Sequence, residues 1–170
     1  RQGVVIVLNA LSKWPDTAVC AEAVNALAER LVDEPDLRKE LGPVDVTNVL
    51  NALSKWPGTA VCAEAARMLA GRLVGDRQLR KAFNALDVAN ALNALSKWPD
   101  APVCAAAAGA LAERLAADPR LRKDLNPLDV ANALNALSKW PGTPVCAAAA
   151  SALAARVAAD PRLRKAFDAQ

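Results

Sequence analysis

Hydrophobic and polar positions alternate along this chain with the period of an amphipathic α-helix, in segments separated by proline, glycine and aspartate. In residues 85–98 the apolar side chains recur three or four positions apart, so they fall on one side of a helix with 100° per residue. We therefore predict a helix here with one buried side. The predicted buried residues are Val88, Ala91, Leu92, Leu95 and Trp98.

Residues that start and stop helices predict the boundaries of these segments. Near the last octapeptide, Asn126 is a good N-cap, Pro127 suits the first helical position, and Asp129 lies near the positive end of the helix dipole. Pro141 restricts the residue before it and ends the segment. Together these residues predict a helix over Asp129–Trp140.

The same signals predict two more helices in the rest of this unit. Thr143 precedes a proline and an alanine-rich stretch, which predicts a capped helix over about Pro144–Ala159. Asp160 precedes another proline and predicts a short helix over Arg162–Phe167. Equivalent residues recur earlier in the chain, so the sequence predicts three helices per unit.

An octapeptide, Leu-Asn-Ala-Leu-Ser-Lys-Trp-Pro, gives the length of the unit. It occurs at residues 8–15, 50–57, 92–99 and 134–141, and each copy begins 42 residues after the last. Helical repeats of about 40–47 residues are typical of HEAT and armadillo arrays, in which stacked units bury a continuous core. We predict an all-α, right-handed α-solenoid of four such units, each with two main helices and one short helix. The units span approximately residues 1–42, 43–84, 85–126 and 127–168.

The two ends of this array have different sequences. The last unit is an ordinary repeat, whereas natural solenoids end in units with a polar outer surface. We therefore expect residues 1–170 to be a single solenoid domain taken from a longer array, with terminal repeats that allow end-to-end association. The first helix is more apolar than its equivalents at residues 4–8. This stretch either contacts a further unit or forms an imperfect cap.

Composition excludes several kinds of active site. The chain has no histidine and no tyrosine, so it cannot by itself form a Ser-His-Asp triad, a Cys-His dyad or a histidine-ligated metal site. No cluster of titratable residues recurs in a pattern that suggests a pocket. We expect a protein that is not an enzyme, with no catalytic, cofactor-binding or metal-binding residues.

Charge and hydropathy narrow the range of partners. The formal net charge of +3 is small for a protein whose affinity comes from neutralising many phosphates, so nucleic acid is not the expected partner. Charges or prolines interrupt every apolar run before it reaches the roughly 18 residues of a membrane span. We expect a soluble chain without a transmembrane segment.

Asparagine and lysine recur on the polar side of the first helix of each unit. Asparagine amides both donate and accept hydrogen bonds, and armadillo proteins use rows of them to hold an extended peptide. The alternative is that these amides bond locally or to the next unit and fix the stacking. The candidate partner-binding residues are Asn48, Asn51, Lys55, Asn90, Asn93, Lys97, Asn132, Asn135 and Lys139, and the first unit keeps Asn9 and Lys13.

An arginine-lysine pair in the short third helix of every unit forms a second candidate surface. It predicts a basic edge that binds an acidic protein segment, an anionic lipid surface or nucleic acid. The alternative is a solvated surface that keeps the array soluble. The pairs are Arg38 and Lys39, Arg80 and Lys81, Arg122 and Lys123, and Arg164 and Lys165.

We also expect arginines of the second helices to pair with aspartates across unit junctions. The arginines are Arg30, Arg72, Arg114 and Arg156, and the aspartates are Asp45, Asp87 and Asp129.

Tryptophan and cysteine each recur once per unit. Trp14, Trp56, Trp98 and Trp140 are expected to pack at a helix corner with the indole N–H on a turn carbonyl. The alternative is a row of exposed anchors for a partner. Cys20, Cys62, Cys104 and Cys146 are expected to be small buried residues, too far apart for disulfides and reduced.

The motif Ser-Lys-Trp-Pro at residues 12–15, 54–57, 96–99 and 138–141, with its period, resembles the SKWP-repeat family of type III secreted effectors from plant-pathogenic bacteria. The resemblance covers essentially the whole chain. It implies secretion by a type III system into a host plant cell, a reducing compartment and a part in virulence, and it implies no catalytic residues. We expect a non-enzymatic protein-interaction scaffold that binds a host protein or an extended peptide segment. A nucleic-acid-binding helical repeat array and a structural spacer within a larger effector are the alternatives.

Overall fold

The computed structural model describes residues 2–167, and all regular secondary structure in this range is helical. The prediction of an all-α fold is confirmed. The first helix of each predicted unit is α1 (Gln2–Leu11), α4 (Pro43–Leu53), α7 (Ala85–Leu95) or α10 (Pro127–Leu137). The second is α2 (Ala18–Asp33), α5 (Ala60–Gly75), α8 (Pro102–Ala117) or α11 (Pro144–Ala159). The short third helices are α3 (Pro35–Glu40), α6 (Arg77–Ala82), α9 (Pro119–Asp124) and α12 (Pro161–Phe167).

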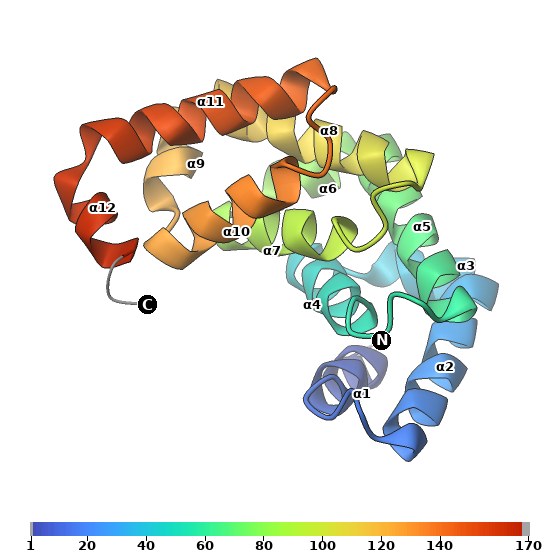
Figure 1. The fold of residues 1–170 in the computed structure, drawn as a ribbon. Helices are drawn as coiled ribbons and strands as arrows, with labels where there is room; N and C mark the ends of the chain where they lie inside the picture. The colour runs from blue at the N-terminus through green and yellow to red at the C-terminus, as the bar shows by residue number, and fades with distance from the viewer. Residues whose placement is uncertain (1, 168–170) are drawn as a thin grey trace.

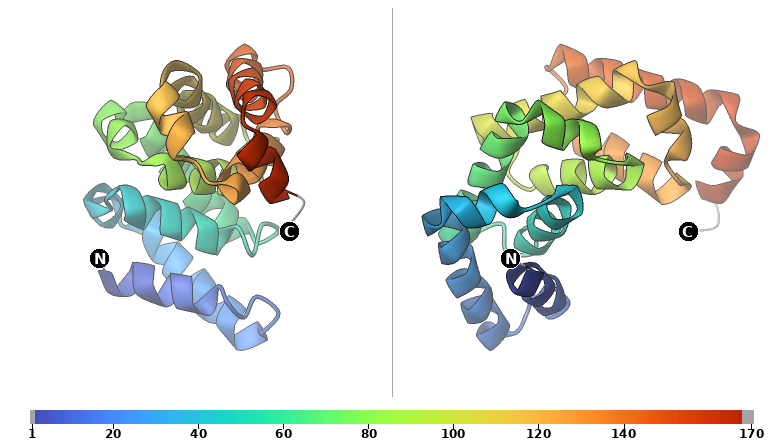
Figure 2. Two further views of the ribbon diagram at one scale, coloured as in Figure 1. Left: turned by 90° about the vertical axis from the view of Figure 1, so that its left-hand side faces the viewer. Right: turned by 180° about the vertical axis from the view of Figure 1, so that it is seen from behind.

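The long helices lie in two layers (Figure 1). In one layer α1, α4, α7 and α10 pack side by side in that order, and in the other α2, α5, α8 and α11 do the same. The short helices lead from the second layer back to the first. The array bends, and both views agree that the first layer lies on the inner side of the bend and the second layer on the outer side (Figures 1 and 2).

Aspartate and asparagine side chains fix the starts of several helices. At α10 the Asn126 side chain accepts a hydrogen bond from the Asp129 N–H at 2.8 Å, and the Asp129 carboxylate accepts one from the Asn126 N–H at 3.2 Å. This is the capping box that the sequence pattern favours. Asp160 caps α12, as predicted. Thr143 is the N-cap residue of α11 and Pro144 begins the helix, as predicted, but the Thr143 side chain makes no capping hydrogen bond.

The first helix of the fourth unit is shorter than predicted at its C-terminal end. It ends at Leu137, three residues before Trp140. The Ser138 hydroxyl donates to the Asn135 carbonyl at 2.6 Å, and the Trp140 N–H reaches back only three residues, to the Leu137 carbonyl at 3.0 Å. The octapeptide therefore ends in a turn tighter than an α-helix, which positions the tryptophan at the corner.

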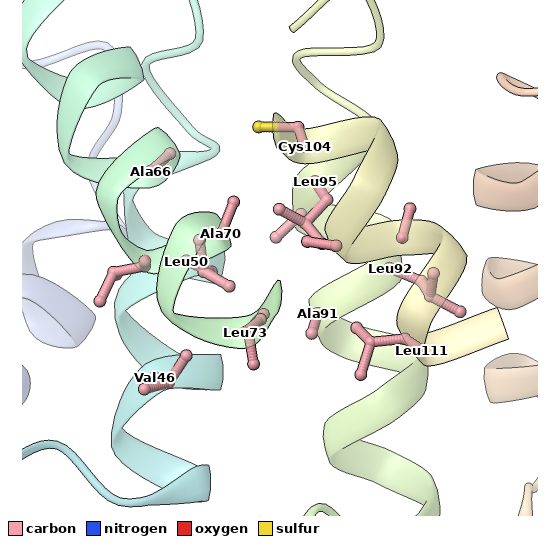
Figure 3. Packing of buried hydrophobic residues seen from close by; sticks show 14 of the residues in the cluster. Val46, Leu50, Ala66, Ala70, Leu73, Ala91, Leu92, Leu95, Cys104 and Leu111 are labelled. Atoms are coloured by element: carbon pink, nitrogen blue, oxygen red, sulfur yellow. The ribbon is translucent and has the colours of Figure 1, made fainter. Parts of the chain in front are cut away.

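Leucine, alanine and valine side chains fill the space between the two layers. The predicted core residues of α7 are confirmed, since Val88, Ala91, Leu92 and Leu95 are fully buried. Figure 3 shows how these side chains meet residues of α5 and α8 from the other layer. Small side chains such as Ala66 and Ala70 in α5 let neighbouring helices approach closely.

Helical periodicity in the second helix of the first unit predicts a buried stripe of Val19, Cys20, Ala23, Val24, Leu27 and Leu31, which is only partly observed in α2. Val24 and Leu31 are fully buried, but Val19 is 72% exposed, and Cys20 and Leu27 are partly exposed. Helices α5 and α8 are covered on both sides by second-layer neighbours, whereas α2 packs against α5 alone in its layer. Stacking therefore decides which residues of this stripe are buried.

Candidate protein-interaction surface

Each first-layer helix presents one stripe of side chains to the outside. In α7 the residues that are not buried are Leu86, Asn90 and Asn93, and Lys97 follows in the turn. These positions are spaced 4, 3 and 4 residues apart, which places them on one side of a helix. We call the equivalent set in all four units the outward stripe. It comprises Ile6, Asn9 and Lys13; Val44, Asn48, Asn51 and Lys55; Leu86, Asn90, Asn93 and Lys97; and Leu128, Asn132, Asn135 and Lys139.

An exposed aliphatic residue begins the stripe in the second, third and fourth units. Val44 is 56% exposed, and Leu86 and Leu128 are each 50% exposed. The first unit has Gln2 at this position, and its exposed Ile6 stands where the other units have their first asparagine. The sequence-based candidate set omitted all of these aliphatic residues. Helical periodicity contains the signal, because Val44, Leu86 and Leu128 each lie four positions before an asparagine of the stripe and opposite the core. Because α4, α7 and α10 pack side by side, these three residues form one row across the array.

The asparagine amides of the stripe have no hydrogen-bond partner in the described part of the chain. Among residues 2–167, the side chains of Asn48, Asn51, Asn90, Asn93 and Asn132 are partly buried and Asn135 is exposed, and none of them makes a hydrogen bond. Serine makes the local bonds instead, since the Ser96 hydroxyl donates to the Asn93 carbonyl at 2.7 Å. The alternative role for these amides, in fixing the stacking, is therefore not observed within the described chain.

Lysine ends the stripe at the corner of each unit. Lys13, Lys55, Lys97 and Lys139 are exposed. Beside Lys97 lies a hollow of about 350 Å³, which is also lined by Arg67, Trp98 and Asp100. Arg67 pairs with Glu64 at 3.0 Å, whereas Lys97 makes no ion pair among residues 2–167. The lysine end of the stripe therefore favours acidic groups.

The arginines of the Arg-Lys pairs bind backbone carbonyls of their own unit. The Arg38 guanidinium donates to the carbonyls of Leu31 and Val32, the last turn of α2, and equivalent bonds come from Arg80, Arg122 and Arg164. These bonds satisfy carbonyls that a helix end leaves unpaired. The paired lysines, Lys39, Lys81, Lys123 and Lys165, are exposed. Partner binding by this edge stays a prediction, and it depends mainly on the lysines.

The predicted arginine-aspartate pairs across the junctions are replaced by a different contact. Arg72 reaches toward the preceding unit, not the following one, and donates to the carbonyls of Arg38 and Leu41. Asp87, the expected partner of Arg72, instead accepts the Asn84 N–H at 3.0 Å. Arg114 and Arg156 cross their junctions as Arg72 does.

Three of the four tryptophans join neighbouring units. The indole N–H of Trp98 donates to the Pro57 carbonyl at 3.0 Å, which lies in the turn of the preceding unit. Trp56 and Trp140 make the same contact with Pro15 and Pro99, so packing with an N–H on a turn carbonyl is confirmed for these residues. Trp14 is 59% exposed and is the exception.

The cysteines lie in the second layer and are free thiols. Cys62, Cys104 and Cys146 are buried as predicted, while Cys20 is partly exposed. Burial raises the pKa of Cys62 and Cys104 to about 11, and it raises the pKa of Cys146 as well. A raised pKa keeps a thiol protonated at neutral pH, so these three are poor nucleophiles.

Residues 2–167 contain no group of three or more acidic or cysteine side chains placed to hold a metal ion. In the same range, no helix has both the length and the apolar character needed to cross a membrane. Comparison of the chain with protein-family models, curated proteins and solved structures finds no match. The function of the outward stripe is therefore inferred from its aliphatic, asparagine and lysine side chains.

Proposed function

We propose that this chain is a non-enzymatic protein-interaction scaffold, a right-handed α-solenoid of four 42-residue units whose outward stripe holds an extended segment of another protein. The observation that carries the proposal is the set of asparagine amides that lack a partner among residues 2–167. An extended segment exposes unpaired backbone N–H and carbonyl groups, and an amide pairs with both.

The spacing of the stripe favours a particular kind of segment. Packed helices lie about 8–10 Å apart, so equivalent stripe residues of neighbouring units recur at about this distance. A chain in the polyproline II conformation advances about 9 Å in three residues and returns to the same side. We therefore propose a partner with an aliphatic side chain at every third position, seated against the row of Val44, Leu86 and Leu128.

The lysine row favours a charge pattern in the same segment. Lys55, Lys97 and Lys139 lie along one margin of the stripe. Carboxylates that follow this margin would form charge-assisted hydrogen bonds with the ammonium groups. The proposed partner is therefore an extended segment with aliphatic residues along one side, which face the aliphatic row, and acidic residues along the adjacent side, which face the lysines.

The resemblance to SKWP-repeat effectors extends this proposal to a biological setting. In that setting the partner is a host plant protein, the chain is delivered into the host cell by a type III system, and the interaction serves virulence. A nucleic-acid-binding array is less well supported, because the arginines of the short third helices already bind backbone carbonyls. Salt-sensitive binding of an oligonucleotide would favour that alternative.

Peptide selection tests the proposal directly. A library of twelve-residue peptides would be screened against the chain, and the enriched peptides measured by calorimetry with wild type and with the Asn93→Ala/Lys97→Ala variant. We expect enrichment of aliphatic residues at every third position and about tenfold weaker binding by the variant, since each lost hydrogen bond costs about 1 kcal/mol.

A matched variant controls for the loss of polar surface elsewhere. Gln78→Ala/Lys81→Ala removes one amide and one ammonium from exposed positions of α6, away from the stripe. Unchanged affinity of this variant would limit binding to the stripe, whereas weaker binding would show that the basic edge with Lys81 contributes as well. Peptides that bind both variants as tightly as wild type would refute the stripe as the binding surface.

A further inference from the structure

A hollow lies where the second and third units meet, between the short helix α6 and the C-terminal half of α8. It has a volume of about 520 Å³, which is in the range of small-molecule sites. Two alanines contribute the apolar part of its lining. The charged part consists of Arg77, Arg80, Lys81 and Arg114, with the carboxylates of Glu113 and Asp118. Because units pack on both sides of this junction, the hollow belongs to the interior of the array.

The backbone holds two of these arginines in fixed positions. The Arg80 guanidinium donates to the Val74 carbonyl at 2.7 Å, and that of Arg114 donates to the Phe83 carbonyl at 2.9 Å. In both residues Nη1 makes these bonds, and the other guanidinium nitrogens make no hydrogen bond among residues 2–167. A guanidinium has several N–H donors, so donors remain for a ligand. Because both groups are already ordered, binding would cost little side-chain entropy.

The positive charge of the hollow is only partly neutralised within residues 2–167. Arg77 and Lys81 are exposed, and neither side chain makes an ion pair or a hydrogen bond in this range. The Asp118 carboxylate accepts two backbone N–H groups at the start of α9, at 2.9 and 3.2 Å. Burial lowers the pKa of Arg114, the charge of Asp118 opposes this, and the charge of Arg80 lowers it further. An anion between these cations would offset their mutual repulsion.

Glu113 adds a second kind of group to the same hollow. It is exposed, and its carboxylate makes no ion pair or hydrogen bond among residues 2–167. An ionised carboxylate only accepts hydrogen bonds, so its partners on a ligand are hydroxyl or ammonium groups. The hollow at the next junction is smaller, about 330 Å³, and has Pro119 and Ala155 where this one has Arg77 and Glu113. Arg77 and Glu113 therefore distinguish this hollow from its neighbour.

We propose that this hollow binds a small soluble phosphate monoester whose organic part carries hydroxyl groups. Arg77, Lys81 and Arg114 bind the phosphate, because guanidinium and ammonium groups make charge-assisted hydrogen bonds to phosphate oxygens. The Glu113 carboxylate accepts hydrogen bonds from the hydroxyl groups. A phosphate monoester carries about two negative charges at neutral pH, which matches the excess of cations over carboxylates in the lining. No residue of the outward stripe lines this hollow, so the site is independent of the function proposed for the stripe.

Isothermal titration calorimetry with inositol monophosphate tests this site, and inorganic phosphate serves as the comparison without hydroxyl-bearing carbon. Wild type should bind inositol monophosphate more tightly than inorganic phosphate. Arg77→Pro removes one cation and should weaken the binding of both compounds about tenfold, since a charge-assisted hydrogen bond is lost. Proline is the residue at this position of α3, α9 and α12. The backbone of Asp76 is extended like that of Asp118, which precedes Pro119, so the variant should fold.

Glu113→Ala tests the contact with the hydroxyl groups. It introduces the residue that the fourth unit has at this position, Ala155. The variant should bind inorganic phosphate at least as tightly as wild type, because a negative charge is removed. Its preference for inositol monophosphate over inorganic phosphate should fall about fivefold, since one hydrogen bond is lost. An unchanged preference would overturn the assignment of a hydroxyl-bearing ligand.

Arg120→Ala is the matched control, because it removes one exposed cation of α9 outside the lining of the hollow. It should change the affinity by less than about twofold, since salt screens distant surface charges. Asn93→Ala/Lys97→Ala should bind inositol monophosphate as wild type does, so failure of this site and failure of the outward stripe are separate results.

Three results would overturn the proposal. They are no binding of inositol monophosphate by wild type, binding that Arg77→Pro leaves unchanged, and equal weakening by Arg77→Pro and Arg120→Ala. Vesicles that contain phosphatidylinositol phosphate present the same chemistry from a membrane. Capture of the chain by these vesicles, without binding of the free compound, would overturn the assignment of a soluble ligand.

Discussion

Trp56, Trp98 and Trp140 combine two contributions to stability in one side chain. Each indole is at most 9% exposed, and each donates its N–H to a proline carbonyl of the preceding unit. A buried aromatic ring contributes apolar area, and the hydrogen bond fixes the ring against one particular carbonyl. At this scale the octapeptide joins neighbouring units, whereas the indole of Trp14 makes no such bond among residues 2–167 and its side chain is 59% exposed.

Replacing Trp98 with phenylalanine separates the two contributions. Trp98→Phe keeps an aromatic ring but leaves the Pro57 carbonyl without its donor, so we expect a loss of about 1 kcal/mol in the free energy of unfolding from the hydrogen bond, in addition to the smaller ring. Urea denaturation measures this loss. Trp14→Phe is the matched control, and its midpoint should stay at the wild-type value. Equal effects of the two substitutions would contradict the role of the junction bond.

Because of its buried thiols, the protein should lose free energy of unfolding as the pH rises in the alkaline range. Burial raises the pKa of Cys62 and Cys104 to about 11, whereas an unfolded thiol ionises near pH 8.5. Between these values the unfolded chain releases protons that the folded chain retains, so raising the pH favours unfolding. The stabilisation is complete below about pH 8.5 and is lost as the pH approaches 11.

Urea midpoints at pH 7.5 and pH 10 measure this effect. We expect the midpoint of wild type to fall, and that of Cys62→Ala/Cys104→Ala to fall less, since all other side chains are the same in both proteins. The same fall in both proteins would show that the thiols do not contribute.

At the scale of the element, arginine side chains bind the backbone carbonyls at helix ends and so hold neighbouring helices together. Arg38, Arg80 and Arg122 each bind carbonyls at the end of the second helix of their own unit, and Arg72 and Arg114 bind carbonyls of the preceding unit. Guanidinium groups suit this task because several donors lie in one plane. The turns between helices are therefore held by side chains as well as by the backbone.

Removing Arg114 tests this role at the level of the element. Arg114→Met keeps the aliphatic stem but leaves the carbonyls of Arg80 and Phe83 without their donor, and we expect a loss of about 1–3 kcal/mol in the free energy of unfolding. Arg30→Met is the control, because Arg30 is exposed and binds only Glu34. Thermal denaturation of both variants checks the comparison, and an unchanged transition for Arg114→Met would contradict the proposed role of the junction arginine.

Local signals in the sequence were sufficient to predict the helices and most of the core. The 3.6-residue period indicated the buried side of α7, and Asn126 and Asp160 indicated helix starts, because both kinds of signal act within one or two turns. Contacts between units could not be predicted in this way. The partner of Arg72 and the exposure of Val19 depend on which units stack against each other. The aliphatic row containing Leu86 was missed because a single exposed leucine is unremarkable until the stacking aligns it with Val44 and Leu128.

At the scale of the whole molecule, repetition turns one small stripe into an extended surface. The first-layer helices lie side by side on the inner side of the bend (Figure 2), so aliphatic, asparagine and lysine positions form parallel rows across the array. Each unit alone offers few contacts. In the function that we propose, several units together offer a segment of another protein repeated hydrogen bonds in one register, and such repeated contacts raise affinity.

Nuclear magnetic resonance of the isotope-labelled chain with a selected peptide tests the proposed surface most directly. The side-chain NH₂ groups of Asn90, Asn93, Asn132 and Asn135 give their own signals, and these groups have no partner among residues 2–167 before binding. We predict that the peptide shifts these signals and slows their exchange with water, with smaller changes in α2, α5, α8 and α11. Shifts confined to the second-layer helices, or to the lysines of α6 and α9, would contradict binding at the outward stripe.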